Sequence, residues 1–247
     1  MQLSLVRREY RGFTLVELVI MIVVIGILAT IATREMSGTI EDAHWENTKK
    51  ELDQLAFAIV GNPDIYVGGA RSDFGYVGDV GGLPSDLNAL VTNPGSYATW
   101  DGPYADSGTS GTEHLSDAWG TAYTYTDTLL RSTGSGSNID KLLANSSSDL
   151  LSNTISGTIV DAGRDIPGSV YRDSLQVRLT YPNGSGGSTT AIVNPSSDGW
   201  FSISSIPVGN RTLQVIYIPN SDTATYAIGV LPGRTARLDI VFPADLW

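Results

Sequence analysis

Residues 7–32 read RREYRGFTLVELVIMIVVIGILATIA, and this stretch decides the fold. Three arginines precede an apolar run from Phe13 to Ala32, which has about the length of a helix that crosses a bilayer. A single carboxylate, that of Glu17, lies near the start of this run. A charged side chain in hydrocarbon costs about 3 kcal/mol or more unless it finds a partner, so Glu17 requires a functional explanation.

Two ordinary interpretations of the run remain open. One is a membrane anchor whose basic flank keeps the first residues on the cytoplasmic side. The other is a cleavable secretory signal, with its apolar core from Leu18 to Leu28 and a small-residue cleavage site at Thr30-Ile31-Ala32. Neither interpretation gives Glu17 a role.

A third interpretation explains the carboxylate. Cleavage between Gly12 and Phe13 would create a cationic α-amino group one helical turn from Glu17. In a bundle of such helices, Glu17 of one subunit pairs with the Phe13 amine of its neighbour. The buried charge is then neutralised only when another subunit is added in register. Under this hypothesis Glu17 is an assembly residue.

The same stretch resembles the class III signal of the type IV pilin and type II secretion pseudopilin superfamily. The similarity consists of a short basic leader, the dipeptide RG and the segment FTLVELV. It implies a prepilin leader at residues 1–12, a prepilin peptidase that cleaves after Gly12, and N-methylation of Phe13. The chain departs from many relatives at Arg34, where they have proline, and a helix kink at that point is therefore in doubt.

The apolar run continues into an amphipathic helix. Apolar positions recur at helical spacing along one stripe: Met36, Ile40, Leu52, Leu55, Ala56 and Ile59. Gly61-Asn62-Pro63 ends the pattern, which predicts a helix over residues 13–61 with a transmembrane or filament-core part at 13–32. A helix of this length spans about 70 Å, too long for one globular core, so lipid or other copies must bury its first half.

Residues 62–150 have the pattern of short elements joined by turns. The segments GLPSDLNAL, WDGPY and DAWGTAYTY occur in the order found in the major pseudopilins of type II secretion, which this region resembles. The resemblance implies a pseudopilin-like globular domain with a calcium-binding loop. In the corresponding loop only Asp140 and Asp149 carry carboxylates, and Gly136 stands where relatives commonly have aspartate. A solvated polar loop is the simpler interpretation, calcium binding remains open, and no metal ligands are assigned.

Residues 151–247 alternate apolar and polar residues between turn signals, as in ISGTIV, LQVRLTY and TLQVIY. Several short strands of this kind predict a small antiparallel β-sandwich. The segments SGTIVDA, DGWFSISSIPVGNRTLQV and LPGRTARLDIVF resemble the carboxypeptidase-regulatory, transthyretin-like β-sandwich. Such domains serve many roles, so this resemblance implies a fold and no activity.

Composition excludes several classes of function. The net charge is −11 and no basic cluster follows the leader, which argues against nucleic-acid binding. There are no cysteines and two histidines, His44 and His114, and none of the H-E-x-x-H, G-x-S-x-G or P-loop motifs occurs. We therefore expect no enzyme activity, although sequence does not show how the many aspartates are arranged in space.

Together these features predict an α+β protein: a long N-terminal helix packed on a small pilin-like α/β-loop domain, followed by a separate all-β sandwich. The expected function is a structural subunit of a type IV pilus-like filament or a type II secretion pseudopilus. The alternative is a minor or tip subunit, or an anchored module that binds through the sandwich with exposed aromatics such as Trp100, Trp200 and Trp247.

The expected partners are other copies in a helical filament, the prepilin peptidase, the assembly platform, other pilins and the membrane. The expected location is the inner membrane, spanned once, with the globular part in the periplasm until a periplasmic or extracellular filament forms. No cofactor other than calcium is considered.

Overall fold

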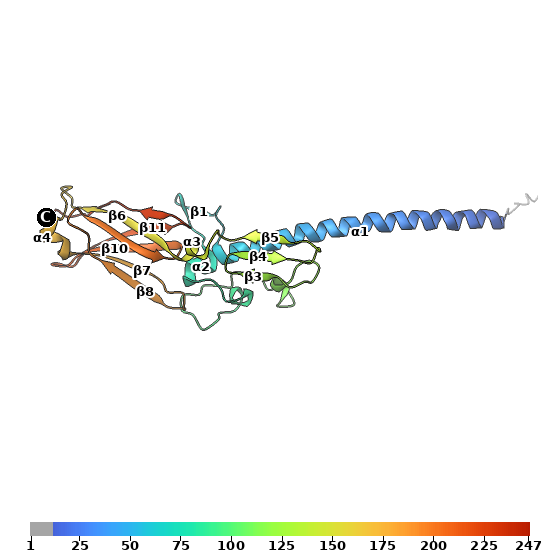
Figure 1. Cartoon of the computed structure of the whole chain (residues 1–247), viewed down its shortest axis with the longest axis horizontal. Coiled ribbons are helices and arrows are strands. Elements are labelled where there is room, and N and C mark those ends of the chain that lie inside the picture. Colours follow the sequence, from blue (N-terminus) through green and yellow to red (C-terminus); the bar gives the residue numbers. More distant parts are fainter. Residues whose placement is uncertain (1–11) are drawn as a thin grey trace, which may run out of the picture. The chain divides into compact units, whose positions relative to one another are not determined.

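The computed structural model describes residues 12–247, so all of the predicted leader except Gly12 lies outside the described residues. Contacts divide the chain between Glu46 and Asn47 into two compact units. Residues 12–46 of the first unit are almost entirely helix, and residues 47–247 contain the rest of that helix and every described strand (Figure 1). The predicted α+β class is confirmed.

The long N-terminal helix is present as α1 (Leu15–Val60), a single element of 46 residues. It begins two residues after Phe13. Gly61 follows its last residue and has a φ of 79°, a left-handed conformation that favours glycine. The Arg71 guanidinium donates to the carbonyl oxygens of Val60 (2.7 Å) and Gly61 (3.1 Å). A cation is favourable at this end because the final carbonyls of a helix lack partners and carry partial negative charge.

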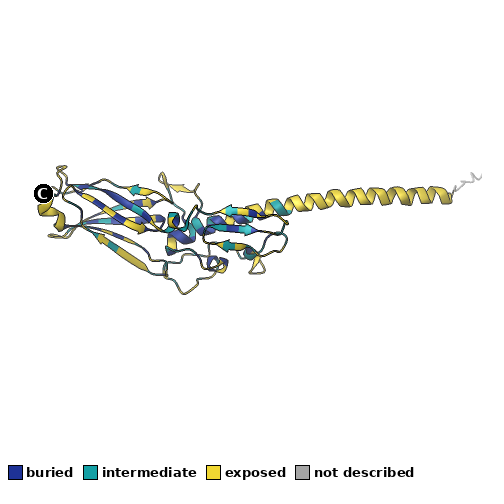
Figure 2. Ribbon diagram, viewed as in Figure 1, coloured by how far each residue is buried: buried dark blue, intermediate teal, exposed yellow. Residues whose placement is uncertain are grey.

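Burial along α1 changes abruptly between the two units. No α1 residue before Asn47 is buried, and this part of the helix is almost wholly yellow in Figure 2. After it, one face of the helix is buried, through Thr48, Leu52, Leu55, Ala56, Ala58 and Ile59. The C-terminal part of α1 is therefore a packing element of residues 47–247, while the preceding part has no apolar partner within its own unit.

The region after α1 contains short elements. They are β1 (Tyr66–Val67), β2 (Ala70–Arg71), α2 (Gly75–Val80), the 3-10 turns η1 (Leu87–Leu90) and η2 (Glu113–Leu115), and β3 (Thr124–Thr126), β4 (Leu129–Ser132) and β5 (Ile139–Leu142). β3, β4 and β5 form an antiparallel sheet in that order.

The sequence favoured a solvated polar loop around Asp140 and Asp149. That expectation was wrong for Asp140, because β4 and β5 form a hairpin there. Leu130 and Ile139 are buried on one face, and Arg131 pairs with Asp140 across the other. An opposite-charge cross-strand pair such as Arg131 and Asp140 stabilises a hairpin. The same segment ends in a short helix, α3 (Ser147–Leu151), whose Leu150 is buried.

The remaining chain is a β-sandwich. Its elements are β6 (Asn153–Val160), α4 (Gly168–Tyr171), η3 (Arg172–Ser174), β7 (Leu175–Pro182), β8 (Ser188–Val193), β9 (Trp200–Ile206), β10 (Gly209–Tyr217), β11 (Asp222–Val230), β12 (Thr235–Arg237) and β13 (Ile240–Val241). One sheet has the order β11-β10-β7-β8, and in the other β6 pairs with β9 on one side and with β12 and β13 on the other.

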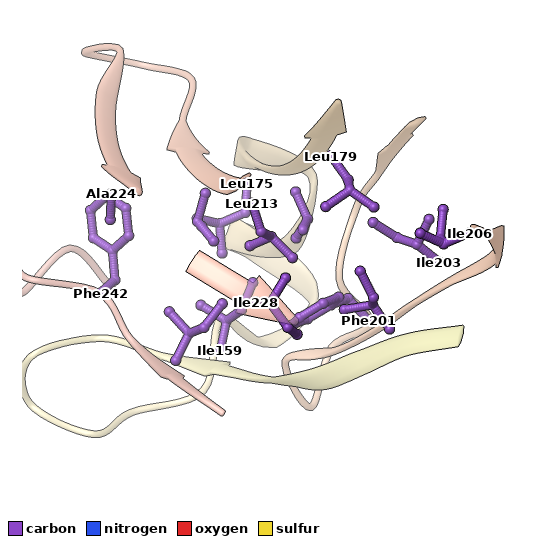
Figure 3. Close-up of a cluster of buried hydrophobic side chains, with 14 of the residues drawn as sticks. Ile159, Leu175, Leu179, Phe201, Ile203, Ile206, Leu213, Ala224, Ile228 and Phe242 are labelled. Carbon is purple, nitrogen blue, oxygen red and sulfur yellow. The ribbon is translucent and has the colours of Figure 1, made fainter. Parts of the chain in front are cut away.

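The second sheet differs from the antiparallel arrangement that we expected, because β12 and β13 run parallel to β6. Both sheets contribute to one apolar core, part of which is drawn in Figure 3. Phe201 and Phe242 are the largest of its fully buried side chains. The described sandwich thus has its own core, as its alternating sequence predicts, while its resemblance to transthyretin-like domains stays a prediction.

Contacts also join the sandwich to the segments that precede it. Arg211 on β10 is buried and donates to the carbonyl oxygens of Gly78 on α2 (3.0 Å) and of Val208 (2.6 Å). Burial lowers the pKa of Arg211 to about 10, a fall that the Asp79 carboxylate partly opposes, so the guanidinium is charged at neutral pH. Residues 47–247 form one compact unit, and the predicted boundary at 150/151 stays a prediction.

We expect Arg211→Met to lower the free energy of unfolding by about 2–3 kcal/mol, because buried carbonyl oxygens lose their donor. Arg178→Met is the matched control, since Arg178 is exposed on β7 and its side chain bonds only to that of Gln176 within the described residues. Urea unfolding of the detergent-solubilised chain measures both. A loss for Arg211→Met no larger than the control's would contradict this role.

Candidate assembly site

The start of α1 carries the residues predicted to direct processing and assembly. Gly12, Phe13 and Glu17 are all exposed, and Phe13 retains 69% of its accessible surface. A Cβ atom added at Gly12 would meet nothing within 4 Å. The described chain thus places no packing constraint on this segment.

Glu17 has a local role that the sequence analysis missed. Its carboxylate accepts from the Thr14 backbone N–H (3.3 Å), while the Glu17 backbone N–H donates to the Thr14 hydroxyl (3.2 Å). This reciprocal arrangement is a capping box, which satisfies donors at a helix N-terminus. Its sequence signal, Thr-x-x-Glu, was available at residues 14–17.

Within residues 12–247, the Glu17 carboxylate accepts from the neutral donors of Thr14. Pairing with the Phe13 amine is a contact between copies after cleavage, so the proposed roles of Gly12, Phe13 and Glu17 stay predictions. The capping box and the pairing use the same side chain, but only the pairing requires its negative charge. A substitution that removes the charge and keeps the hydrogen-bonding group therefore separates the two roles.

The helix around Glu17 exposes a large apolar surface. Fifteen large hydrophobic side chains between residues 15 and 40 each keep between 47% and 80% of their surface: Leu15, Val16, Leu18, Val19, Ile20, Met21, Ile22, Val23, Val24, Ile25, Ile27, Leu28, Ile31, Met36 and Ile40. They surround the helix and include a stretch apolar and long enough to cross a membrane. A helix that is hydrophobic on all sides is stable only within lipid or among other helices.

The two carboxylates considered for calcium already have partners. Asp140 accepts a two-point contact from Arg131, at 2.6 and 2.7 Å. Asp149 belongs to a capping box with Ser146 at the start of α3. No group of three metal-ligating side chains occurs among residues 12–247. Calcium binding stays an untested prediction.

The tryptophans named for a binding module are partly engaged in packing. The Trp100 indole donates to the Ala89 carbonyl oxygen (3.0 Å), and that of Trp247 donates to the Asp165 carbonyl oxygen (2.8 Å). Trp200 keeps 39% of its surface and lies under the Arg237 guanidinium, 5.7 Å from the ring centre. The described residues therefore do not form an aromatic binding platform from all three.

Of the two histidines, His114 has the more unusual environment. It retains 8% of its surface, and neither ring nitrogen has a hydrogen-bond partner in the described chain. Burial lowers the pKa of His114, so the imidazole is neutral at pH 7. Among residues 12–247, no serine, aspartate or glutamate bonds to the His114 ring, so the histidine has no partner of the kind found in catalytic pairs.

Comparison with known proteins decides the family. Residues 7–33 match the prokaryotic N-terminal methylation motif. Over 119 residues the chain is 31% identical to the type II secretion system core protein G of Xanthomonas campestris pv. campestris, and the match spans 48% of this chain and 70% of that protein. The chain belongs to the core protein G family. As a member of the pilin and pseudopilin superfamily, it is a structural subunit of a pilus or pseudopilus.

Solved structures resemble this core protein G family member only weakly. The dioxygenase domain of a carbohydrate-binding fusion from Streptomyces sp. SirexAA-E shares 14% identity over 41% of this chain and 86% of that chain, with a TM-score of 0.31. The major pilin subunit of Bacillus cereus shares 13% identity over 47% and 37% of the two chains, with a TM-score of 0.26. Scores this low establish neither fold nor function.

Burial of His114 predicts a pH dependence of stability. The pKa of His114 is about 6.5 in the unfolded chain and lower in the folded chain. As the pH falls through 6.5, the unfolded chain therefore binds a proton at His114 before the folded chain does, which favours unfolding. We expect the free energy of unfolding to fall between pH 7.5 and 5.5, and to fall less in His114→Gln. Urea unfolding across this range is the measurement, with His44→Gln as the reference for loss of a histidine. Equal slopes for wild type and His114→Gln would contradict the prediction.

Proposed function

We propose that the mature chain begins at Phe13, after cleavage by a prepilin peptidase that also methylates the new amine, and that it polymerises through α1. The filament is the pseudopilus of a type II secretion system, in preference to a surface pilus, because the matched curated relative is a component of that system. The observation that supports this proposal most strongly is the first half of α1. Its apolar side chains are exposed, and one carboxylate, that of Glu17, lies near its start.

Before assembly, the apolar segment holds the chain in the inner membrane with the globular part in the periplasm. In that state the capping box with Thr14 supplies hydrogen bonds to the Glu17 carboxylate. Hydrogen bonds from neutral donors reduce the cost of a carboxylate near lipid, while its charge remains unpaired.

During assembly, α1 exchanges lipid for the α1 helices of other copies. Glu17 then meets the Phe13 amine of a neighbouring copy, and the two opposite charges stabilise each other strongly in the low dielectric of a helical core. A copy added out of register would leave both charges buried and unpaired. Apolar packing thus supplies cohesion, while this pair selects the register. The assembly platform and other pseudopilins are the remaining partners, and no catalytic role is assigned.

Two substitutions separate capping from pairing. Glu17→Gln keeps the capping box, because glutamine also serves at its third position, but removes the charge. Thr14→Ala removes the cap hydroxyl and keeps the charge. We expect Glu17→Gln to reduce filament yield about tenfold or more and Thr14→Ala to stay within about twofold of wild type. Filaments sheared from cells are quantified by immunoblot against the membrane fraction. The reverse order of effects would contradict pairing.

Processing is tested at Gly12, where a larger side chain meets no atom of the described chain within 4 Å. We expect Gly12→Val to block cleavage, so that intact mass shows Met1 retained. Wild type from the membrane should begin at N-methylated Phe13. Ala32→Val is the control, and should be cleaved normally. A wild-type chain beginning at Thr33 would instead identify a secretory signal and contradict the proposed function.

A further inference from the structure

One pocket in the second unit is lined by several carboxylates and by no basic side chain. It is about 600 Å³ in volume, and residues of α1, of the turn before α2 and of the loop at 104–114 line it. Leu55, Phe57 and Ala58 of α1 contribute apolar surface. Four carboxylates also line it, those of Glu51, Asp73, Asp106 and Glu113, and its lining includes no lysine or arginine.

Within the described residues, the hydrogen bonds that these carboxylates accept come from neutral donors. Glu51 accepts from the Tyr123 hydroxyl (2.6 Å), and burial, with a contribution from Glu51, raises the pKa of Tyr123 so that its hydroxyl stays protonated. Asp73 accepts from the Asn62 N–H (2.7 Å). Of these four carboxylates, Asp73 also interacts with the nearby Arg71 guanidinium. Neutral donors alone contact the other three within residues 12–247, so the pocket favours a cation with an apolar stem.

Asp106 and Glu113 also accept from neutral backbone donors. Asp106 accepts from the Gly108 N–H (2.8 Å), and Glu113 accepts from the Thr109 N–H (3.1 Å). The neighbouring His114 gives a second, independent indication of a ligand. It lines the pocket, is more than nine-tenths buried, and has two ring nitrogens without partners. A neutral imidazole offers one acceptor nitrogen, which suits a ligand with several N–H donors.

A complementary cation lies on the part of α1 that other copies must cover. Arg34 is the only lysine or arginine among residues 12–46, and it forms no ion pair within the part of the chain that the structure describes. Its helical neighbours at three and four residues' distance are Thr30, Ile31, Ser37 and Gly38, none of which is acidic. Glu35 is adjacent in sequence and therefore projects from a different side of the helix. Arg34 thus has no acidic neighbour within one turn on its own helix face, and a carboxylate of another copy can supply its counter-charge.

We propose that Arg34 of one copy enters this pocket on a neighbouring copy in the filament. The guanidinium has five N–H donors, enough to contact carboxylates and an imidazole nitrogen together, while its stem packs on Leu55 and Ala58. The inference rests on the proposed filament function and adds to it a second charge contact between copies. It also gives a role to the arginine that replaces the proline of many relatives.

Photo-crosslinking in assembled filaments tests this contact directly. Gln54 lines the pocket and is exposed, so p-benzoylphenylalanine is introduced there in the full-length chain. We expect irradiation to give dimers whose crosslinked peptide contains residues 30–38 of a second copy. The same label at Thr189, exposed on β8, is the control and should not capture that peptide. Capture from position 54 of other segments only, or of none, would overturn the proposal.

Charge reversal gives a second readout. We expect Arg34→Glu to lower filament yield about tenfold, and Gln54→Lys in the same chain to restore it to within about twofold of wild type. Arg234→Glu, with the same charge change in the loop between β11 and β12, should have no effect. An unchanged yield for Arg34→Glu would overturn the contact while leaving the filament function intact. Absence of filaments from the unaltered chain would instead overturn the proposed function itself.

Discussion

The structure depends on one constraint: the first half of α1 is apolar on every side and has no partner within its own unit. Such a helix must lie in lipid or among other helices. The same segment therefore serves as a membrane anchor for a single subunit and as the filament core for many. The second half of α1 differs, since its apolar residues follow one face and are buried by the globular part. A single helix thus joins a surface that requires other copies to a unit that folds around its own core.

In the proposed filament, Glu17 carries the specificity of this arrangement. Apolar packing between helices is strong but tolerates sliding, because neighbouring turns present similar side chains. A buried carboxylate does not tolerate sliding, because a misplaced neighbour leaves it without a cation. The capping box with Thr14 supplies neutral hydrogen bonds in the isolated chain. Exchange of these bonds for the neighbour's amine makes the charge pair a property of the assembled state alone.

Sequence predicted the parts of the fold that depend on periodicity. The long helix and the alternation in strands such as β6, β7 and β10 were recognisable because each repeats a simple spacing. The β4–β5 hairpin was missed because its glycine- and serine-rich turn dominates the composition, although Leu130 and Ile139 carry an apolar pattern. Arg211 shares its strand face with Leu213, so its inward direction was predictable from alternation, but its acceptor on α2 was not.

Some of the candidate sites could also be predicted from the sequence, and others could not. The processing and assembly residues are adjacent in sequence and were predicted together, and the capping box could have been recognised from the same four residues. The carboxylate pocket was beyond sequence reasoning, since α1, the turn before α2 and the loop that contains His114 converge only in the folded unit. The two aspartates considered for calcium are close in sequence, but each has a separate partner in the structure. Asp140 pairs with Arg131, and Asp149 forms a capping box with Ser146.

The central claim is that Glu17 of one copy neutralises the Phe13 amine of the next. A cryo-EM reconstruction of native filaments that resolves the α1 core measures this contact directly. The account predicts the two groups of neighbouring copies within about 4 Å, the usual limit for an ion pair, with the Thr14 cap released. A core in which Glu17 remains capped by Thr14 and every Phe13 amine lies far from any carboxylate would contradict it.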